Sequence, residues 1–162
     1  MGVADPFCPV LSKIVQEASA RVGCTVHAGG TFVTIEGPRF STKAESAVWR
    51  QLGFSIIGMT TAPEVFLARE AEMHYAVMAH VTDYDVWHTD ETVSTELVFS
   101  RFQNNISLAQ RTIAEAVGQI GAMEYACGCE SALSSALLTN RDRVPPETVE
   151  RLGPIVSKYL KA

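Results

Sequence analysis

Apolar residues recur at helical spacing in several parts of the chain and predict amphipathic helices. The clearest stripe begins after Ser94 and predicts a long helix. Its apolar positions are Val98, Phe102, Ile106, Ala109, Ile113 and Val117. Helix-start signals and the same spacing predict further helices over about 10–22, after Thr42, from Pro63, near 130–138 and over 146–159.

Short apolar stretches between these helices are rich in β-compatible residues and predict strands. They cover residues 24–35, 54–59 and 74–81, and the first is predicted to be a hairpin that turns at Gly29 and Gly30. Alternating strands and helices indicate an α/β fold. No internal repeat or low-complexity linker interrupts the pattern, so residues 1–162 are interpreted as one domain or part of one.

Composition narrows the function classes. With 162 residues, 47% of them hydrophobic, and a net charge of -5, the chain can support one core. An acidic balance without a basic patch argues against nucleic-acid binding. No apolar run approaches the roughly 20 residues that span a bilayer, and the start lacks the pattern of a signal peptide. We therefore expect a cytoplasmic protein that binds neither nucleic acid nor membrane.

The four cysteines do not form a recognisable metal motif. Cys127 and Cys129 are close together, but such pairs are more often reduced and without a ligand in a cytosolic chain. Cys8 and Cys24 are interpreted as ordinary buried thiols. A zinc site needs four well-placed ligands, and the histidines show no metal-ligand spacing with the cysteines. These histidines are His27, His74, His80 and His88. The sequence therefore predicts no metal site.

Two carboxylates directly follow the predicted strand 74–81. If the chain is extended there, Asp83 and Asp85 face the same side because side chains alternate along a strand. Neighbouring carboxylates in a partly closed site repel, which favours a raised pKa for one of them. A carboxylic acid can protonate the imidazole side of a departing purine. The alternative is an acidic turn in solvent, which on spacing alone is the more common case.

Hydroxyl groups stand between the predicted strand 54–59 and the helix from Pro63. Free backbone amides at a helix start attract phosphate, and the hydroxyls of Thr60 and Thr61 add donors. Simple capping of the helix by Thr61 or its neighbour is the alternative. Taken alone, capping is the commoner explanation.

A loop aromatic and a capping signal follow residues 31–36. Thr42 and Glu45, three residues later, match a capping box. Phe40 is then on a loop, where its ring can stack on a flat base or fill the core. Arg39 can bind an anion or form an ion pair with Glu36 or Glu45.

These three runs, in register, resemble S-methyl-5'-thioadenosine phosphorylases of the nucleoside phosphorylase superfamily. The motifs are Thr-Ile-Glu-Gly-Pro-Arg-Phe-Ser-Thr at 34–42, Gly-Met-Thr-Thr-Ala-Pro-Glu-Val at 58–65 and Thr-Asp-Tyr-Asp-Val-Trp at 82–87. The likeness begins at 4–9 and covers most of the chain. It implies the C-terminal portion of the nucleoside phosphorylase fold, with a mixed central sheet flanked by helices.

The resemblance assigns roles to individual residues. It implies that Met59 lies against the ribose, Thr60 helps to hold phosphate and Phe40 packs on the purine. Asp83 becomes the general acid and Asp85 the acceptor for the exocyclic amine. The other implied substrate contacts are Tyr84 through its backbone, Ser41, Thr95 and, in an apolar slot for the 5'-group, Val98 with Phe99.

Chemistry at the base favours adenine. Relatives that cleave 6-oxopurines look similar here but carry a glutamate where this chain has Ser41 and an asparagine where it has Asp83. A 6-amino group donates to Asp85, whereas a 6-oxo group would place one acceptor against another.

The implied reaction is phosphorolysis of S-methyl-5'-thioadenosine to adenine and 5-methylthioribose 1-phosphate, in purine and methionine salvage. Such an enzyme is a pentosyltransferase that needs no cofactor, because inorganic phosphate is the co-substrate. The alternatives are an adenosine or general purine nucleoside phosphorylase, and an inactive nucleoside-binding fragment that needs a partner. The resemblance also implies a homotrimer. The Cys-X-Cys pair is similar to one that takes part in disulfides in some thermophilic relatives, but two cysteines so close are more often reduced in a cytosolic chain.

The chain also departs from the family pattern. Family members are longer, and their first part carries a glycine-rich phosphate loop and an arginine-histidine pair that are not found here. Residues 1–162 are therefore interpreted as a single nucleoside phosphorylase domain that lacks the N-terminal portion. We expect a companion chain to supply the missing phosphate site, or the polypeptide alone to be inactive.

Overall fold

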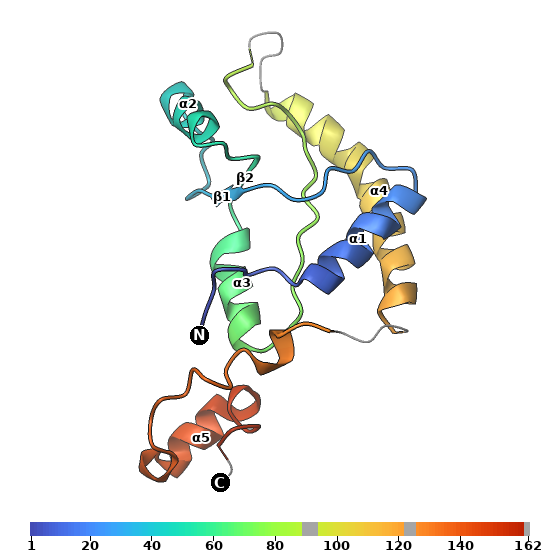
Figure 1. The fold of residues 1–162 in the computed structure, drawn as a ribbon. Coiled ribbons are helices and arrows are strands. Elements are labelled where there is room, and N and C mark those ends of the chain that lie inside the picture. Colours follow the sequence, from blue (N-terminus) through green and yellow to red (C-terminus); the bar gives the residue numbers. More distant parts are fainter. Residues whose placement is uncertain (89–93, 122–125, 161–162) are drawn as a thin grey trace. The chain divides into compact units, whose positions relative to one another are not determined.

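A computed structural model describes residues 1–88, 94–121 and 126–160 (Figure 1). The described chain divides into two compact units. Unit 1 comprises Met1–Ser12, Pro63–Ala76 and residues 126–160. Unit 2 comprises Lys13–Ala62 and the described residues from Val77 to 121, that is 77–88 and 94–121. Each unit is described by itself, and the single-domain interpretation stays a prediction.

The helices and strands follow one another in the order expected of an α/β chain. They are α1 (Pro9–Arg21), β1 (Phe32–Thr34), α2 (Lys43–Gln51), β2 (Ile56–Gly58), α3 (Thr61–Glu70), α4 (Thr95–Ile120) and α5 (Pro146–Leu152), with 3-10 turns η1 (Cys129–Ser131), η2 (Arg141–Arg143) and η3 (Gly153–Ile155).

Strands β1 and β2 form the two-stranded parallel sheet of unit 2. Phe32 pairs with Ile56 and Thr34 with Gly58, and the amide of Ile35 extends the ladder by donating to the Gly58 carbonyl at 2.9 Å. Gly58 is required by this packing, since a Cβ there would lie 2.6 Å from the ring of Phe32. The sheet thus places the segments after both strands at one edge.

Helix α2 begins as the sequence predicts. Thr42 is the N-cap, its hydroxyl accepts from the Glu45 amide, and the Glu45 carboxylate accepts from the Thr42 amide, so the capping box is confirmed. The guanidinium of Arg39 donates to both Glu45 carboxylate oxygens at 2.8 and 2.7 Å. Hydrogen bonds from Arg39 and then from Thr42 lower the pKa of Glu45 to about 2. Of the alternatives for Arg39, the structure shows the ion pair with Glu45.

Helix α4 also begins where predicted, with the Ser94 hydroxyl accepting from the Leu97 amide. It packs against the part of α1 that belongs to unit 2. The Arg21 guanidinium lies 2.8 Å from the Glu115 carboxylate, and Ala18 is completely buried. Thr112 and Ala116 of α4 are buried as well. Phe102, Ile113 and Val117 of the predicted apolar stripe are exposed, so the covered face of α4 is not the one that the stripe predicts.

Two predicted β elements differ from the structure. Among the described residues, 24–31 and 74–81 form no strand, so the predicted hairpin and the third strand are wrong. Both stretches lack a ladder partner in the described chain, and a strand exists only through its ladder. Gly29 and Gly30 do adopt positive φ values, so the chain turns there without pairing.

The C-terminal helices are also shorter than predicted. Only the 3-10 turn η1 is found in the predicted helix 130–138. The helix predicted over 146–159 stops at Leu152, because Gly153 has a positive φ of 42° and Pro154 cannot donate a backbone hydrogen bond.

Glu72 joins the C-terminal segment to the end of α3 within unit 1. Its carboxylate accepts hydrogen bonds from the Leu133 amide at 2.9 Å, the Lys158 ammonium at 3.2 Å and the Tyr159 hydroxyl. Partial burial raises the pKa of Glu72, but these hydrogen bonds outweigh it and bring the pKa below the ordinary value of 4.5. The ionised form is therefore the one that stabilises the folded unit.

Replacing Glu72 with glutamine should lower the free energy of unfolding at pH 7 by about 1 kcal/mol. We place the effect at the low end for charged hydrogen bonds because solvent screens the exposed Lys158 ammonium. The contribution of a group with a lowered folded-state pKa is fully present above its unfolded-state pKa, near 4.5, and is lost as the pH falls through the folded-state pKa. The difference between variant and parent should therefore shrink below about pH 4.5 and vanish only below the folded-state value. Urea unfolding at several pH values measures this, with Glu70→Gln, an exposed neighbour, as control.

In the described part of the chain, no helix is both long and apolar enough to cross a bilayer.

Candidate functional site

The first two sequence runs meet at the edge of the small sheet. The loop 35–42 follows β1 and Met59 follows β2, and the carboxyl ends of parallel strands lie at the same edge. A Cβ on Gly37 would lie 2.7 Å from the Met59 sulfur, so the glycine backbone and the methionine side chain are in direct contact. The Thr34 hydroxyl accepts from the Ala62 amide at 3.3 Å, which fixes the segment after Met59.

The start of α3 has the geometry that the sequence predicts. Ala62 is extended, with φ -104° and ψ 135°, so the regular helix begins at Pro63. Thr60 is exposed just before this junction, and Thr61 is buried. The exposed hydroxyl of Thr60 is therefore the one that a ligand at the sheet edge can reach.

The third run is a hydrogen-bonded turn rather than the end of a strand. The Asp83 carboxylate accepts from the Thr82 hydroxyl at 2.7 Å and from the Asp85 amide at 2.9 Å. The Asp85 carboxylate in turn accepts from the Val86 amide at 2.8 Å. Asp85 has a φ of 61°, in the left-handed region that aspartate and asparagine tolerate better than most residues. The two carboxylates are thus fixed by different donors.

Helix α4 holds this turn from one side. The Arg101 guanidinium donates to the Thr82 carbonyl at 2.6 Å, and the Asn105 amide donates to the Val81 carbonyl at 3.3 Å. The sequence reasoning missed both residues. Their spacing of i and i+4 places them on one helix face, but it does not indicate which distant segment they bind.

Helix α2 contacts the turn through its own cation. The Arg50 guanidinium lies 3.8 Å from the centre of the Trp87 ring. Tyr84 stacks on His88 with 5.1 Å between ring centres, yet its side chain stays 63% exposed. Arg50, like Arg101, was not singled out from the sequence. Phe40 is likewise exposed, at 56%, so two aromatic rings of unit 2 are accessible to a flat ligand.

All the predicted substrate contacts fall in unit 2. They are Phe40, Ser41, Met59, Thr60, Asp83, Tyr84, Asp85, Thr95 and Val98. Thr95 and Val98 lie in the first turn of α4, directly after its N-cap. Direct contacts join the first run to the second through Gly37 and Met59. The helix that follows the first run is joined to the third run through Arg50 and Trp87.

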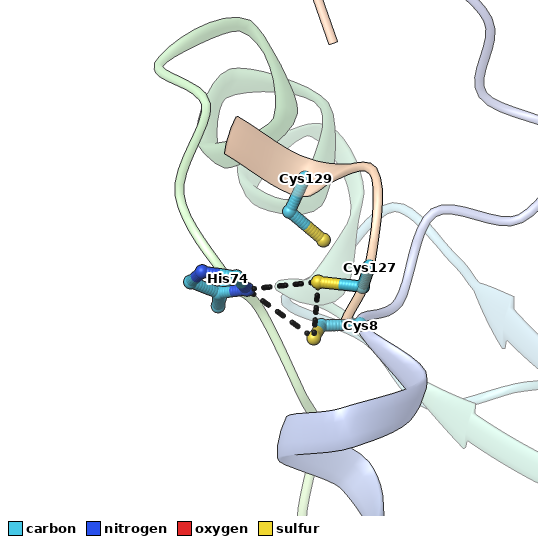
Figure 2. Close-up of side chains that lie close together, drawn as sticks. All are labelled: Cys8, His74, Cys127 and Cys129. Carbon is cyan, nitrogen blue, oxygen red and sulfur yellow. Dashed lines mark hydrogen bonds between the residues drawn. The ribbon is translucent and has the colours of Figure 1, made fainter. Parts of the chain in front are cut away.

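A second cluster of reactive side chains lies in unit 1 (Figure 2). The Sγ atoms of Cys8, Cys127 and Cys129 and a ring nitrogen of His74 all lie within 4.8 Å of one another. The four cysteines are free thiols, and Cys24 is half-buried in unit 2. The sequence reasoning, which predicted no metal, considered spacing along the chain only. The cluster assembles from three separate segments, which spacing does not reveal.

Comparison with known proteins places the chain in a family. A family model described as the phosphorylase superfamily matches residues 2–119, and the chain belongs to that superfamily. Its curated relatives include two S-methyl-5'-thioadenosine phosphorylases. The protein of Chloroflexus aurantiacus is 47% identical, and the match covers 95% of this chain and 54% of the relative. The protein of Geobacter sulfurreducens is 45% identical, and the match covers 97% of this chain and 55% of the relative. The resemblance seen in the three sequence runs is confirmed.

Solved structures give the same result for the fold. A methylthioadenosine phosphorylase from an antarctic soil metagenomic library matches with a TM-score of 0.87 at 39% identity, over 95% of this chain and 55% of that one. The methylthioadenosine phosphorylase of Schistosoma mansoni in complex with adenine matches with a TM-score of 0.77 at 34% identity. This match covers 89% of this chain and 56% of the Schistosoma chain. The fold is therefore an α/β portion of the nucleoside phosphorylase fold. The chain spans about half the length of the curated relatives it matches.

Proposed function

We propose that this chain carries the base- and ribose-binding part of an enzyme that cleaves S-methyl-5'-thioadenosine with phosphate. The single observation that carries the proposal is the Asp83–Asp85 turn, whose two carboxylates have separate hydrogen-bond donors. Two carboxylates in different environments can take different roles, one as acid and one as acceptor. The relatives described above, which are S-methyl-5'-thioadenosine phosphorylases, support the same reaction.

The reaction that we propose is a displacement at the sugar. A phosphate oxygen forms a bond to the anomeric carbon while the bond from that carbon to the base nitrogen breaks. The bonding electron pair passes into the purine, and Asp83 gives a proton to the imidazole side of the leaving base. The products are adenine and 5-methylthioribose 1-phosphate, which makes the enzyme a pentosyltransferase.

Asp85 recognises the base in this proposal. Its Oδ1 is fixed by the Val86 amide, and the rest of the carboxylate accepts from the exocyclic amine of adenine. Tyr84 contributes its backbone and Ser41 lines the base side. Phe40, exposed on its loop, stacks on the purine.

The sugar and its substituents meet the sheet edge and the first turn of α4. Met59 lies against the ribose, and Thr60 helps to hold phosphate. Thr95 and Val98 contact the 5'-substituent, for which a methylthio group needs only an apolar surface.

The remaining parts of the proposal concern the whole enzyme. Inorganic phosphate is the co-substrate and no organic cofactor takes part. We propose a homotrimer in the cytoplasm that acts in purine and methionine salvage, with a companion N-terminal chain completing the phosphate site where the 162 residues do not suffice.

Relative turnover of three nucleosides tests this function. The protein, alone and mixed with the N-terminal half of a curated relative, is assayed with S-methyl-5'-thioadenosine, adenosine and inosine in phosphate buffer. We expect the methylthio substrate to have the highest kcat/KM and inosine the lowest. A relative in solved structures is named an adenosine/methylthioadenosine phosphorylase, so equal use of adenosine would favour that second function. Preference for inosine would overturn the role of Asp85.

A further inference from the structure

Four side chains with metal-binding atoms converge in unit 1 (Figure 2), whereas every residue of the proposed substrate site belongs to unit 2. Cys8 precedes α1 and is completely buried, His74 follows α3, and Cys127 and Cys129 lie at η1. The Cys8 amide donates to the Tyr75 carbonyl at 2.7 Å, which holds the first two segments together.

The three distances among the Cys8, Cys127 and His74 atoms match the edges of a tetrahedral zinc site. With Zn–S near 2.3 Å and Zn–N near 2.1 Å, a tetrahedron has S–S edges of about 3.8 Å and S–N edges of about 3.6 Å. The Cys8 and Cys127 sulfurs are 3.6 Å apart, and His74 Nδ1 lies 3.4 Å from the first and 3.3 Å from the second. The Cys129 sulfur lies within 4.8 Å of all three.

The surroundings of the cluster are those of a metal site. His74 Nε2, the nitrogen turned away from the sulfurs, lies 3.4 Å from a Glu130 carboxylate oxygen. A carboxylate on the second ring nitrogen orients a metal-bound imidazole and raises its basicity. The Arg69 guanidinium donates to the Cys129 sulfur at 3.7 Å, and the Leu11 amide donates to the Cys8 sulfur at 3.4 Å, so both sulfurs are positioned by donors of unit 1.

We propose that Cys8, His74, Cys127 and Cys129 bind one Zn²⁺ in a closed structural site. Four protein ligands fill the tetrahedron, so no position is left for water or substrate and the site is structural rather than catalytic. Binding displaces the proton of each thiol, and the metal joins three segments of unit 1 that are distant in sequence. The site stands independently of the proposed reaction.

A disulfide is the competing fate of these thiols. A disulfide needs about 2.05 Å between sulfurs, and the Cys8 and Cys127 sulfurs are 3.6 Å apart. A disulfide also gives no role to the imidazole nitrogen that faces both sulfurs or to the carboxylate behind it. A soft cation with a preference for thiolate and imidazole accounts for all of these contacts.

Metal content and thiol protection of the full chain test the proposal without any mutation. The protein is expressed with zinc, freed of loose metal and analysed, and we expect about one zinc per chain. Alkylation followed by peptide mapping should then show Cys24 modified well before Cys8, Cys127 and Cys129. Cobalt added to the chelator-stripped protein should give the thiolate charge-transfer and intense d–d absorption of a tetrahedral site. Absence of stoichiometric metal, equal reactivity of all cysteines, or a mapped disulfide in the freshly purified protein would overturn the proposal.

Matched variants test which residues bind the zinc, and thermal unfolding of the parent chain gives a second measurement. Cys129→Ser and His74→Asn should lose zinc, whereas Cys24→Ser and His27→Asn, which change residues outside the cluster, should retain it. Glu130→Gln, which leaves all four ligands in place, should weaken zinc about 10-fold or more in a chelator competition. Bound zinc should also raise the thermal midpoint of unfolding of the parent chain. Retention of zinc by Cys129→Ser, or equal affinity in Glu130→Gln and the parent, would contradict this assignment.

Discussion

Replacing Asp83 with asparagine should lower kcat/KM for S-methyl-5'-thioadenosine by about 10²- to 10⁴-fold, the usual contribution of a general acid. Asparagine keeps the shape of the side chain. Its Oδ1 can still accept from the Asp85 amide, and its Nδ2 can donate to the Thr82 hydroxyl, which can accept as well as donate, so the turn should survive. The amide has no acidic proton, and the purine must then leave as an anion. Adenine release in phosphate buffer, measured across pH, gives the rate and its acid-dependent limb.

A carboxylate outside the site is the control for this substitution. Asp142 is exposed in the C-terminal part of unit 1, so Asp142→Asn removes an equal charge and should leave kcat/KM unchanged. Near-UV circular dichroism and adenine binding by calorimetry check that Asp83→Asn still folds and binds the base. Full activity in a folded Asp83→Asn protein would refute the acid role.

Replacing Asp85 with asparagine should shift the base preference from adenine toward 6-oxopurines. The backbone tolerates the change, because asparagine also accepts the left-handed φ of 61° at this position. The new Oδ1 can keep its bond from the Val86 amide, while Nδ2 now offers a donor where the carboxylate offered an acceptor. That donor suits a 6-oxopurine and opposes the amine of adenine.

The expected effect is a change in discrimination rather than a uniform loss. Sites that hydrogen-bond one substrate group discriminate by about 10⁴-fold or more against an analogue without it, so the ratio of kcat/KM for S-methyl-5'-thioadenosine over inosine should fall at least about 10²-fold. Calorimetry with adenine and hypoxanthine follows the same change without chemistry. Asp142→Asn, which removes an equal charge outside the site, is the control and should leave the ratio of the two affinities unchanged. An unchanged ratio in Asp85→Asn would show that another group reads the base.

Local signals in the sequence predicted the helix starts well. The Thr42 and Glu45 capping box, the Ser94 cap and Pro63 at the first regular position of α3 are all confirmed, since each depends only on neighbouring residues. The stretch 74–81 was predicted wrongly because its apolar composition fits a strand, yet it finds no ladder partner among the described residues. The predicted C-terminal helix ran past Gly153, whose positive φ ends it.

The same contrast between local signals and long-range contacts applies to the candidate sites. The three motif runs were visible because each is continuous in sequence, and the turn at Asp83 is where they predict a ligand. Arg101 and Arg50, which hold that turn through a carbonyl and a ring, could not be found from motifs because they act across the fold. Cys8, His74 and the Cys-X-Cys pair come together only in the folded chain, so rules based on spacing along the sequence could not find the cluster.

Product analysis with and without phosphate tests the proposed reaction most directly. S-methyl-5'-thioadenosine is incubated with the protein, alone and together with the N-terminal half of a curated relative, and the products are separated by chromatography. We predict adenine and an equal amount of 5-methylthioribose 1-phosphate, formed only when phosphate is present and abolished by Asp83→Ala. Adenine released equally in phosphate-free buffer, or no cleavage in either preparation, would contradict it.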